Sequence, residues 1–74
     1  MKKKTKEKRT KEEQEILKLF GNNLKDIRNQ KKMSQEDLAY EAGFSRSYYT
    51  EVETGQRNIS LLNLVRLGLT LNTD

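Results

Sequence analysis

The sequence contains no cysteine, histidine or proline. Without cysteine there can be no disulfide, and without cysteine and histidine the usual zinc ligand sets are excluded. Cysteine and histidine are also the residues that many enzymes use as nucleophile and general base. The sequence has neither a glycine-rich phosphate loop nor an evident pair of catalytic carboxylates. We therefore expect a protein that is not an enzyme, with no metal and no cofactor. The lack of proline is compatible with an all-helical chain.

Long apolar segments are also missing. No apolar run approaches the roughly 20 residues that span a bilayer, so we expect no membrane partner. The basic N-terminus leads into Glu12 and Glu13 rather than into an apolar segment, which argues against a secretory signal. With the lack of cysteine, these features suit a cytoplasmic protein. The 74 residues allow one small domain, with no visible second domain to bind a small-molecule substrate.

Charge is distributed unevenly along the chain. Residues 1–11 hold seven Lys/Arg and one Glu, a net charge of +6, whereas residues 12–74 hold eight Lys/Arg and ten Asp/Glu, a net charge of −2. We expect residues 1–11 to form a disordered basic tail and residues 12–74 to form the folded domain. The tail suits phosphate binding, but it is equally interpreted as a solvated arm that aids solubility.

Three serines mark helix starts in the second half of the chain. Ser34, Ser45 and Ser60 are favourable N-caps, and Asp37 completes a capping box with Ser34. Glycines fall where the first two of these helices should stop, and glycine readily adopts the left-handed conformation found there. Each cap is also flanked by apolar residues at hydrophobic-staple spacing: Met33 and Leu38, Phe44 and Tyr49, Ile59 and Leu64. The two stop signals are Gly43 and Gly55.

An earlier helix is predicted to begin near Thr10 or Lys11, with Thr10 as its cap and glutamates in its first turns. Gly21 and the following Asn22-Asn23 weaken its middle, so a break is possible there. The segment 20–31 has the more regular pattern. The apolar positions with helical periodicity are Ile16, Leu17, Phe20, Leu24 and Ile27.

Residues 34–58 have the layout of two short helices joined by a tight turn. Ala39 permits close approach of the two helices, and Gly43 permits the turn. Such a helix-turn-helix places its second helix in the major groove of DNA. A helical hairpin that binds no DNA would show the same small residues, so the polar face of the second helix decides between them. The expected shared core is Leu38, Phe44, Tyr49 and Val52.

Residues 20–72 resemble the DNA-binding domain of the Cro/repressor family of bacterial and phage transcription factors. Residues 44–58 are especially similar to restriction–modification controller proteins, through Arg46, Tyr48, Val52-Glu53, Gly55 and Arg57-Asn58. The resemblance implies an all-α fold: a compact, lambda-repressor-like bundle of four to five helices. It also implies a DNA-binding transcriptional regulator that binds double-stranded DNA, usually as a homodimer on an inverted repeat.

Eight residues are candidates for DNA contact. Arg46 can donate two hydrogen bonds to a guanine, and Glu51 can accept one from a cytosine, although phosphates repel it. Gln35 at a helix start suits a phosphate contact. Each has a structural alternative, such as a solvated side chain, a helix-start residue or a turn residue. The full set is Gln35, Arg46, Ser47, Tyr48, Thr50, Glu51, Arg57 and Asn58.

The resemblance also assigns a structural role to Arg28 and Glu53. In family members that resemble this chain these positions form a buried ion pair between the first helix and the recognition helix. The alternative is two unrelated surface charges. If the pair is buried, the loss of one partner leaves the other charge without compensation.

The last predicted helix is apolar on two sides. One stripe, expected to face inward, comprises Leu61, Leu64, Leu67 and Leu71, and a second comprises Leu62, Val65 and Leu69. The second stripe is either a dimer interface or surface left bare because the chain stops at Asp74 before a fifth helix. The second stripe is also compatible with an alternative function, that of a protein-interaction module such as an antitoxin. A phage or mobile-element repressor is the remaining alternative to a restriction–modification controller.

Overall fold

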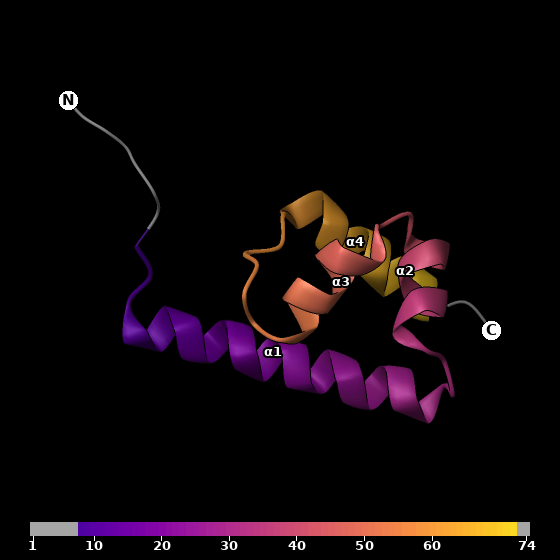
Figure 1. The fold of residues 1–74 in the computed structure, drawn as a ribbon, viewed down its shortest axis with the longest axis horizontal. Coiled ribbons are helices and arrows are strands. Elements are labelled where there is room, and N and C mark those ends of the chain that lie inside the picture. The colour runs from indigo at the N-terminus through magenta and orange to yellow at the C-terminus, as the bar shows by residue number, and fades with distance from the viewer. Residues whose placement is uncertain (1–7, 73–74) are drawn as a thin grey trace.

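The computed structural model describes residues 8–72, which form four α-helices and no strands within that range. The helices are α1 (Lys11–Gln30), α2 (Gln35–Ala42), α3 (Arg46–Glu53) and α4 (Leu61–Leu71). Figure 1 shows α1 lying along one side of the other three helices. Helix α3 packs against α1 and α2, and α4 packs against α2. The predicted all-α helix-turn-helix bundle is confirmed.

The helix starts follow the predicted capping. Thr10 and Ser34 each complete a capping box, with Glu13 and Asp37 respectively. Ser45 and Ser60 each accept a hydrogen bond from the backbone amide three residues further on. These side chains satisfy donors that the first helical turn leaves unpaired, so the caps determine where each helix begins.

Helix α2 ends at Gly43, which has a φ of 83° and takes the left-handed conformation. The turn is closed by a 2.8 Å hydrogen bond from the Phe44 amide to the Ala39 carbonyl. Gly55 after α3 has a φ of 81°. Both predicted stops are confirmed, because only glycine adopts this conformation without a steric penalty.

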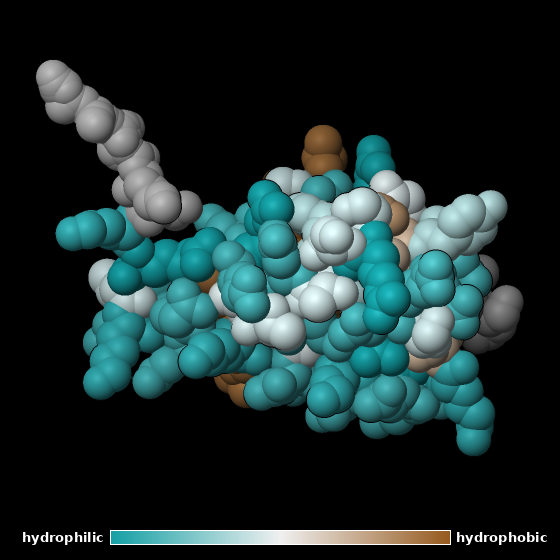
Figure 2. Space-filling model, in the orientation of Figure 1, coloured by the Kyte–Doolittle hydropathy of each residue, from teal (hydrophilic) through white to brown (hydrophobic). Residues whose placement is uncertain are grey.

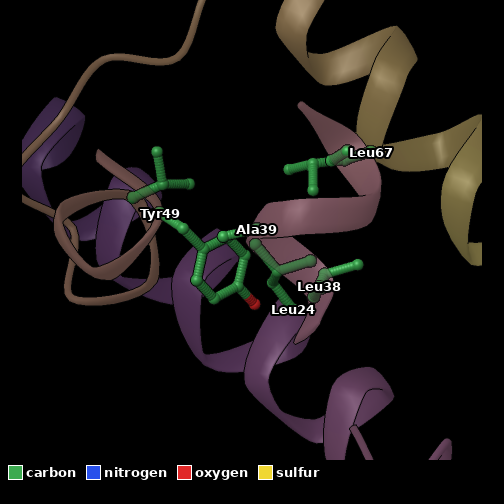
Figure 3. Close-up of a cluster of buried hydrophobic side chains, with 7 residues drawn as sticks. Leu24, Leu38, Ala39, Tyr49 and Leu67 are labelled. Carbon is green, nitrogen blue, oxygen red and sulfur yellow. The ribbon is translucent and has the colours of Figure 1, made fainter. Parts of the chain in front are cut away.

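A single apolar cluster holds the four helices together. Figure 3 shows labelled side chains from all four helices converging on it. The predicted core residues Leu38, Tyr49 and Val52 are at most 1% exposed, and Phe44 packs against the cluster while partly buried. The cluster consists of Leu24, Leu38, Ala39, Ala42, Tyr49, Val52 and Leu67.

Helix α1 is continuous, so the possible break at Gly21 does not occur. Gly21 is buried where α1 crosses the end of α3, and a Cβ there would lie 2.2 Å from the Glu53 carbonyl oxygen. The glycine therefore permits a close approach of two backbones. Packing against α3 offsets the low helix propensity of glycine at this position.

Two residues of the α4 stripe expected to face inward are exposed. Leu61 and Leu64 are 74% and 40% exposed, so their assignment to the inward face was wrong. Ile16 and Ile27, which belong to the periodic apolar pattern of α1, are also exposed, at 63% and 41%. Leu61 lies six residues, or about 9 Å along the axis, from Leu67. Ile16 lies about 12 Å along α1 from Leu24. The core is too small to cover the ends of α1 and α4, and helical periodicity alone does not show where a covering partner stops.

Two predictions concern the N-terminal end of the chain. Most of the predicted basic tail lies outside the described residues, so its disorder stays a prediction. Lys11, which we assigned to the tail, is the first residue of α1.

Among the described residues, no helix has the length and apolar character needed to cross a membrane.

Candidate nucleic-acid interface

The first turn of α3 presents polar side chains to solvent. Ser45 accepts a 3.1 Å hydrogen bond from the Tyr48 amide, which directs the chain into α3 and leaves Arg46 and Ser47 exposed. Within the part of the chain that the structure describes, the Arg46 guanidinium makes no hydrogen bond or ion pair. Its donors are therefore available to an external acceptor.

Five of the eight candidate residues line one surface depression, which we call the α3 depression. It lies between the start of α2 and the exposed side of α3. The sequence separates Gln35 from the others by the whole helix-turn-helix bend, and the tertiary structure brings them together. The lining residues are Gln35, Arg46, Ser47, Thr50 and Glu51. Figure 2 shows that hydrophilic residues predominate on the face of the molecule seen in this view.

Gln35 connects the two helices of the motif. Its Nε2 donates a 2.7 Å hydrogen bond to Glu53, and its Oε1 accepts a 3.0 Å hydrogen bond from the Thr50 hydroxyl. One amide hydrogen is left for another acceptor. The amide is thus oriented by α3 before any ligand binds, whereas sequence reasoning considered only a phosphate contact or a helix-start residue without a partner.

Arg57 and Asn58, in the loop between α3 and α4, line a neighbouring depression. We call it the loop depression; it is lined by Arg9, Glu51, Gln56, Arg57 and Asn58. Glu51 lines both depressions, so the two adjoin at this residue. The Arg57 guanidinium donates to Glu51 Oε1 at 2.6 and 3.0 Å, and this pair partly neutralises the repulsion expected between Glu51 and a phosphate.

Tyr48 lies beside this surface rather than in either depression. Its ring meets Phe44 edge to face at a centroid distance of 5.1 Å, and Arg57 lies over the ring at 5.1 Å. Its hydroxyl accepts a 3.0 Å hydrogen bond from Asn63 of α4. The ring therefore supports Arg57. The contact with Asn63 was not predicted, because nothing in a sequence relates residues 15 positions apart on different helices.

Glu53 belongs to a buried network that is linked to the α3 depression through Gln35. Its carboxylate accepts hydrogen bonds from Arg28 at 2.8 and 3.1 Å and from the Tyr49 hydroxyl at 2.6 Å, besides the one from Gln35. Arg28 also donates to the Met33 carbonyl at 2.8 Å. The side chains of Arg28 and Glu53 are 10% and 3% exposed, so the predicted buried ion pair is confirmed.

The network changes the proton affinity of its members. Burial raises the pKa of the Glu53 carboxyl, but hydrogen bonds from Arg28, Tyr49 and Gln35 outweigh this, so its pKa lies below its usual range. Burial and the hydrogen bond to Glu53 raise the pKa of the Tyr49 hydroxyl well above its usual value. At neutral pH the Glu53 carboxyl is therefore ionised, and the Tyr49 hydroxyl keeps its proton.

The segment before α1 also reaches the loop depression. The Arg9 guanidinium donates to the Gln56 carbonyl at 3.2 Å and to Gln14 at 3.3 Å, while Gln14 donates to the Gly55 carbonyl at 2.7 Å. Sequence analysis did not single out Arg9 or Gln14, because it counted Arg9 only as one of the charges of the basic tail. Its position just before the Thr10 cap was the available signal, since a residue next to a capped helix start has a restricted position.

Comparison with known proteins identifies the family. Residues 24–74 match the model of a family described as helix-turn-helix. Control protein C.MunI of Mycoplasma sp is 45% identical over 58 residues, covering 72% of this chain and 78% of its own. This chain belongs to the helix-turn-helix family of control proteins. The predicted resemblance to that family is confirmed, and so is the predicted function of a DNA-binding transcriptional regulator.

Further family members give the same result. Control protein C.BamHI of Bacillus amyloliquefaciens is 43% identical over 57 residues, covering 76% of this chain and 70% of its own. The crystal structure of the restriction–modification controller protein C.AhdI from Aeromonas hydrophila is similar with a TM-score of 0.77 and 43% identity. It covers 81% of this chain and 91% of the other. Membership therefore extends to the fold as well as the sequence.

Proposed function

We propose that this protein controls a restriction–modification operon by binding an inverted repeat as a homodimer, with α3 in the major groove. The observation that supports this most directly is the α3 depression, where an unpaired Arg46 stands beside an amide already oriented by α3. The family relatives include control proteins, one of them described as a restriction–modification controller. The proposal includes no catalytic role, and it implies a cytoplasmic location because the target is DNA.

The candidate residues take different roles in this proposal. Arg46 reads a guanine through O6 and N7, and Ser47 and Thr50 contact base edges or phosphates nearby. Glu51 accepts a hydrogen bond from a cytosine amino group through Oε2, because Arg57 occupies only Oε1. The remaining four position the protein on the DNA backbone: Gln35, Tyr48, Arg57 and Asn58.

The dimer in this proposal forms through α4. Leu62 and Val65, one turn apart on that helix, are 72% and 48% exposed. Adjacent exposed apolar side chains of this kind mark interaction surfaces in soluble proteins. Two α3 helices related by a two-fold axis would meet successive major grooves about 34 Å apart. An inverted repeat would therefore match the symmetry of the dimer.

Selection of bound sequences from a random DNA library tests the proposal. We expect enrichment of an inverted repeat with a fixed spacing between its halves. Enrichment of a single half-site would contradict the dimer, and no enrichment by folded protein would contradict sequence-specific regulation. The Arg46→Ala variant serves as the matched comparison, because it should retain the fold and lose the preference at one position of each half-site.

A further inference from the structure

The loop depression contains an arginine that the proposed function does not use. Arg9 precedes α1, yet its side chain lies with Arg57 and Asn58, which are 48 and 49 positions later in the sequence. We propose that Arg9 binds a phosphate of the DNA backbone and extends the interface onto the segment before α1. This inference rests on the proposed function, because it needs DNA to lie across the same surface.

The position of Arg9 is set by the loop itself. Its Nη2 donates to the Gln56 carbonyl at 3.2 Å, and its Nη1 donates to Gln14 Oε1 at 3.3 Å. Gln14 in turn donates to the Gly55 carbonyl at 2.7 Å. The guanidinium is therefore held beside Arg57 before DNA arrives. Less side-chain entropy is lost on binding than for a freely moving arginine.

The charge of Arg9 is not compensated by a carboxylate. Both of its hydrogen-bond acceptors are neutral oxygens, and no ion pair within the described residues includes it. Glu13 lines another depression together with Arg9, but among the described residues no ion pair joins the two, and the Glu13 carboxylate accepts from the Thr10 amide in the capping box. Glu51 pairs with Arg57 instead. An anion in the loop depression would thus meet one uncompensated positive charge.

The hydrogen bonds of Arg9 are also incomplete. Its Nε is shielded from solvent and has no hydrogen-bond partner. Its two existing bonds are longer than is usual for a charged donor, so a phosphate oxygen would be a stronger acceptor for the same guanidinium. The planar guanidinium matches the geometry of a phosphate, which can accept two parallel hydrogen bonds.

DNA is the source of this phosphate because of where the depression lies. The loop depression adjoins the α3 depression at Glu51, so a duplex read by Arg46 would pass its backbone beside the loop. A phosphate contact carries no sequence information, and its loss should weaken all sites by a similar factor. Arg9 is thus a positioning residue rather than a base reader.

The salt dependence of operator binding tests this role. For Arg9→Gln we expect about tenfold weaker binding per protomer. The slope of log affinity against log salt should become shallower by about 0.9 per protomer, with unchanged sequence preference. Gln14→Ala is the control for charge alone, because it removes the hydrogen bonds of Gln14 to the loop and to Arg9 but keeps the charge of Arg9. It should leave the slope of the wild-type protein unchanged.

Replacing single operator phosphates by uncharged methylphosphonates completes the test. At one position in each half-site, the replacement should weaken binding of the wild-type protein and leave binding of Arg9→Gln unchanged. If the wild-type protein selects an operator but the slopes and phosphate profiles of the two proteins coincide, Arg9 only supports the loop, and the inference is wrong. If the folded wild-type protein selects no sequence, the proposed function itself fails, and the inference fails with it.

Discussion

At the scale of single residues, Glu53 both stabilises the domain and orients a polar side chain at its surface. Its carboxylate accepts four hydrogen bonds from Arg28, Gln35 and Tyr49. It is 6% exposed as a residue, so neither water nor salt can replace those partners. The same carboxylate orients the Gln35 amide at the edge of the α3 depression. A change at this one residue should therefore affect folding first and DNA binding second.

Substitution of Glu53 by alanine should lower the free energy of unfolding by about 3–5 kcal/mol, because it leaves the Arg28 charge buried without a partner. Chemical denaturation monitored by circular dichroism measures this loss. Glu36→Ala is a suitable control, since Glu36 is an exposed acid at the start of α2. A loss of less than about 1 kcal/mol for Glu53→Ala would show that the pair contributes no more than a surface pair.

The pH dependence of unfolding should report the same network. The pKa of Glu53 is lowered by folding, so its stabilisation is fully present above the unfolded value of 4.5 and is lost as the pH falls below it. The pKa of Tyr49 is raised, so its contribution is fully present below 10.0 and is lost at higher pH. Denaturation across this range should show a smaller acid loss for Glu53→Gln and a smaller alkaline loss for Tyr49→Phe. Identical profiles in all three proteins would contradict the assignment.

The prediction for base-pair specificity concerns Arg46. Replacement by alanine should relax the preference for one base pair in each half-site by about 1–3 kcal/mol, since a bidentate contact to guanine is lost. Competition between operator variants in a gel-shift or anisotropy assay measures this. Lysine at the same position should recover non-specific affinity but only part of the discrimination. A uniform loss across all operators would instead assign Arg46 to a phosphate.

At the scale of helices, two glycines within helices show how context decides the effect of a residue. Gly21 in α1 faces the carbonyl group of Glu53, whereas Gly68 in α4 has nothing within 4 Å of the position where a Cβ would lie. Both weaken the intrinsic helix propensity equally. Only Gly21 allows a helix crossing that a side chain would block. Gly68 makes no comparable close approach.

Alanine at these two positions should therefore have opposite effects. Gly21→Ala should destabilise the protein by about 1–3 kcal/mol, because α1 and α3 must move apart. Gly68→Ala should stabilise it by about 0.5–1 kcal/mol through helix propensity alone. Thermal melts of both variants beside the wild-type protein provide the comparison. Equal changes of the same sign would contradict the close packing at Gly21.

At the scale of the whole molecule, the folded part has little net charge and an apolar surface on α4. Residues 12–74 carry a net charge of −2, so in the proposed complex this part attracts DNA through the local placement of Arg46 and Arg57, with Arg9 added from the preceding segment, rather than through bulk charge. In the proposed dimer, the exposed side of α4 would contact a second copy. Two copies would double the number of phosphate contacts and steepen the salt dependence accordingly.

Replacing Leu62 by lysine should abolish or strongly weaken the proposed dimer, because the interface would bury an unpaired charge. Sedimentation velocity over a concentration range measures the association. Leu19→Lys on α1 is the matched control, since Leu19 is 62% exposed and Leu62 is 72% exposed. If both variants associate as the wild-type protein does, α4 is not the dimer interface.

Local sequence determined the boundaries of the elements. The caps at Thr10, Ser34, Ser45 and Ser60, and the stop at Gly43, act through hydrogen bonds and backbone conformations within a few residues. Such interactions are complete within one segment, so they can be predicted without a fold. The resemblance to control proteins added the pairing of Arg28 with Glu53, which no local rule contains.

The tertiary structure decided which side chains share an environment. It buried Leu67 and left Leu61 exposed on the same stripe, because the core covers only part of α4. It brought Gln35 to Thr50 and Arg9 to Gln56, residues that are 15 and 47 positions apart. Helix crossings and loop packing determine these contacts through distances in space, and sequence periodicity does not record them. The sequence alone therefore determined the helices and the class of partner, and the fold assembled the surface that would meet it.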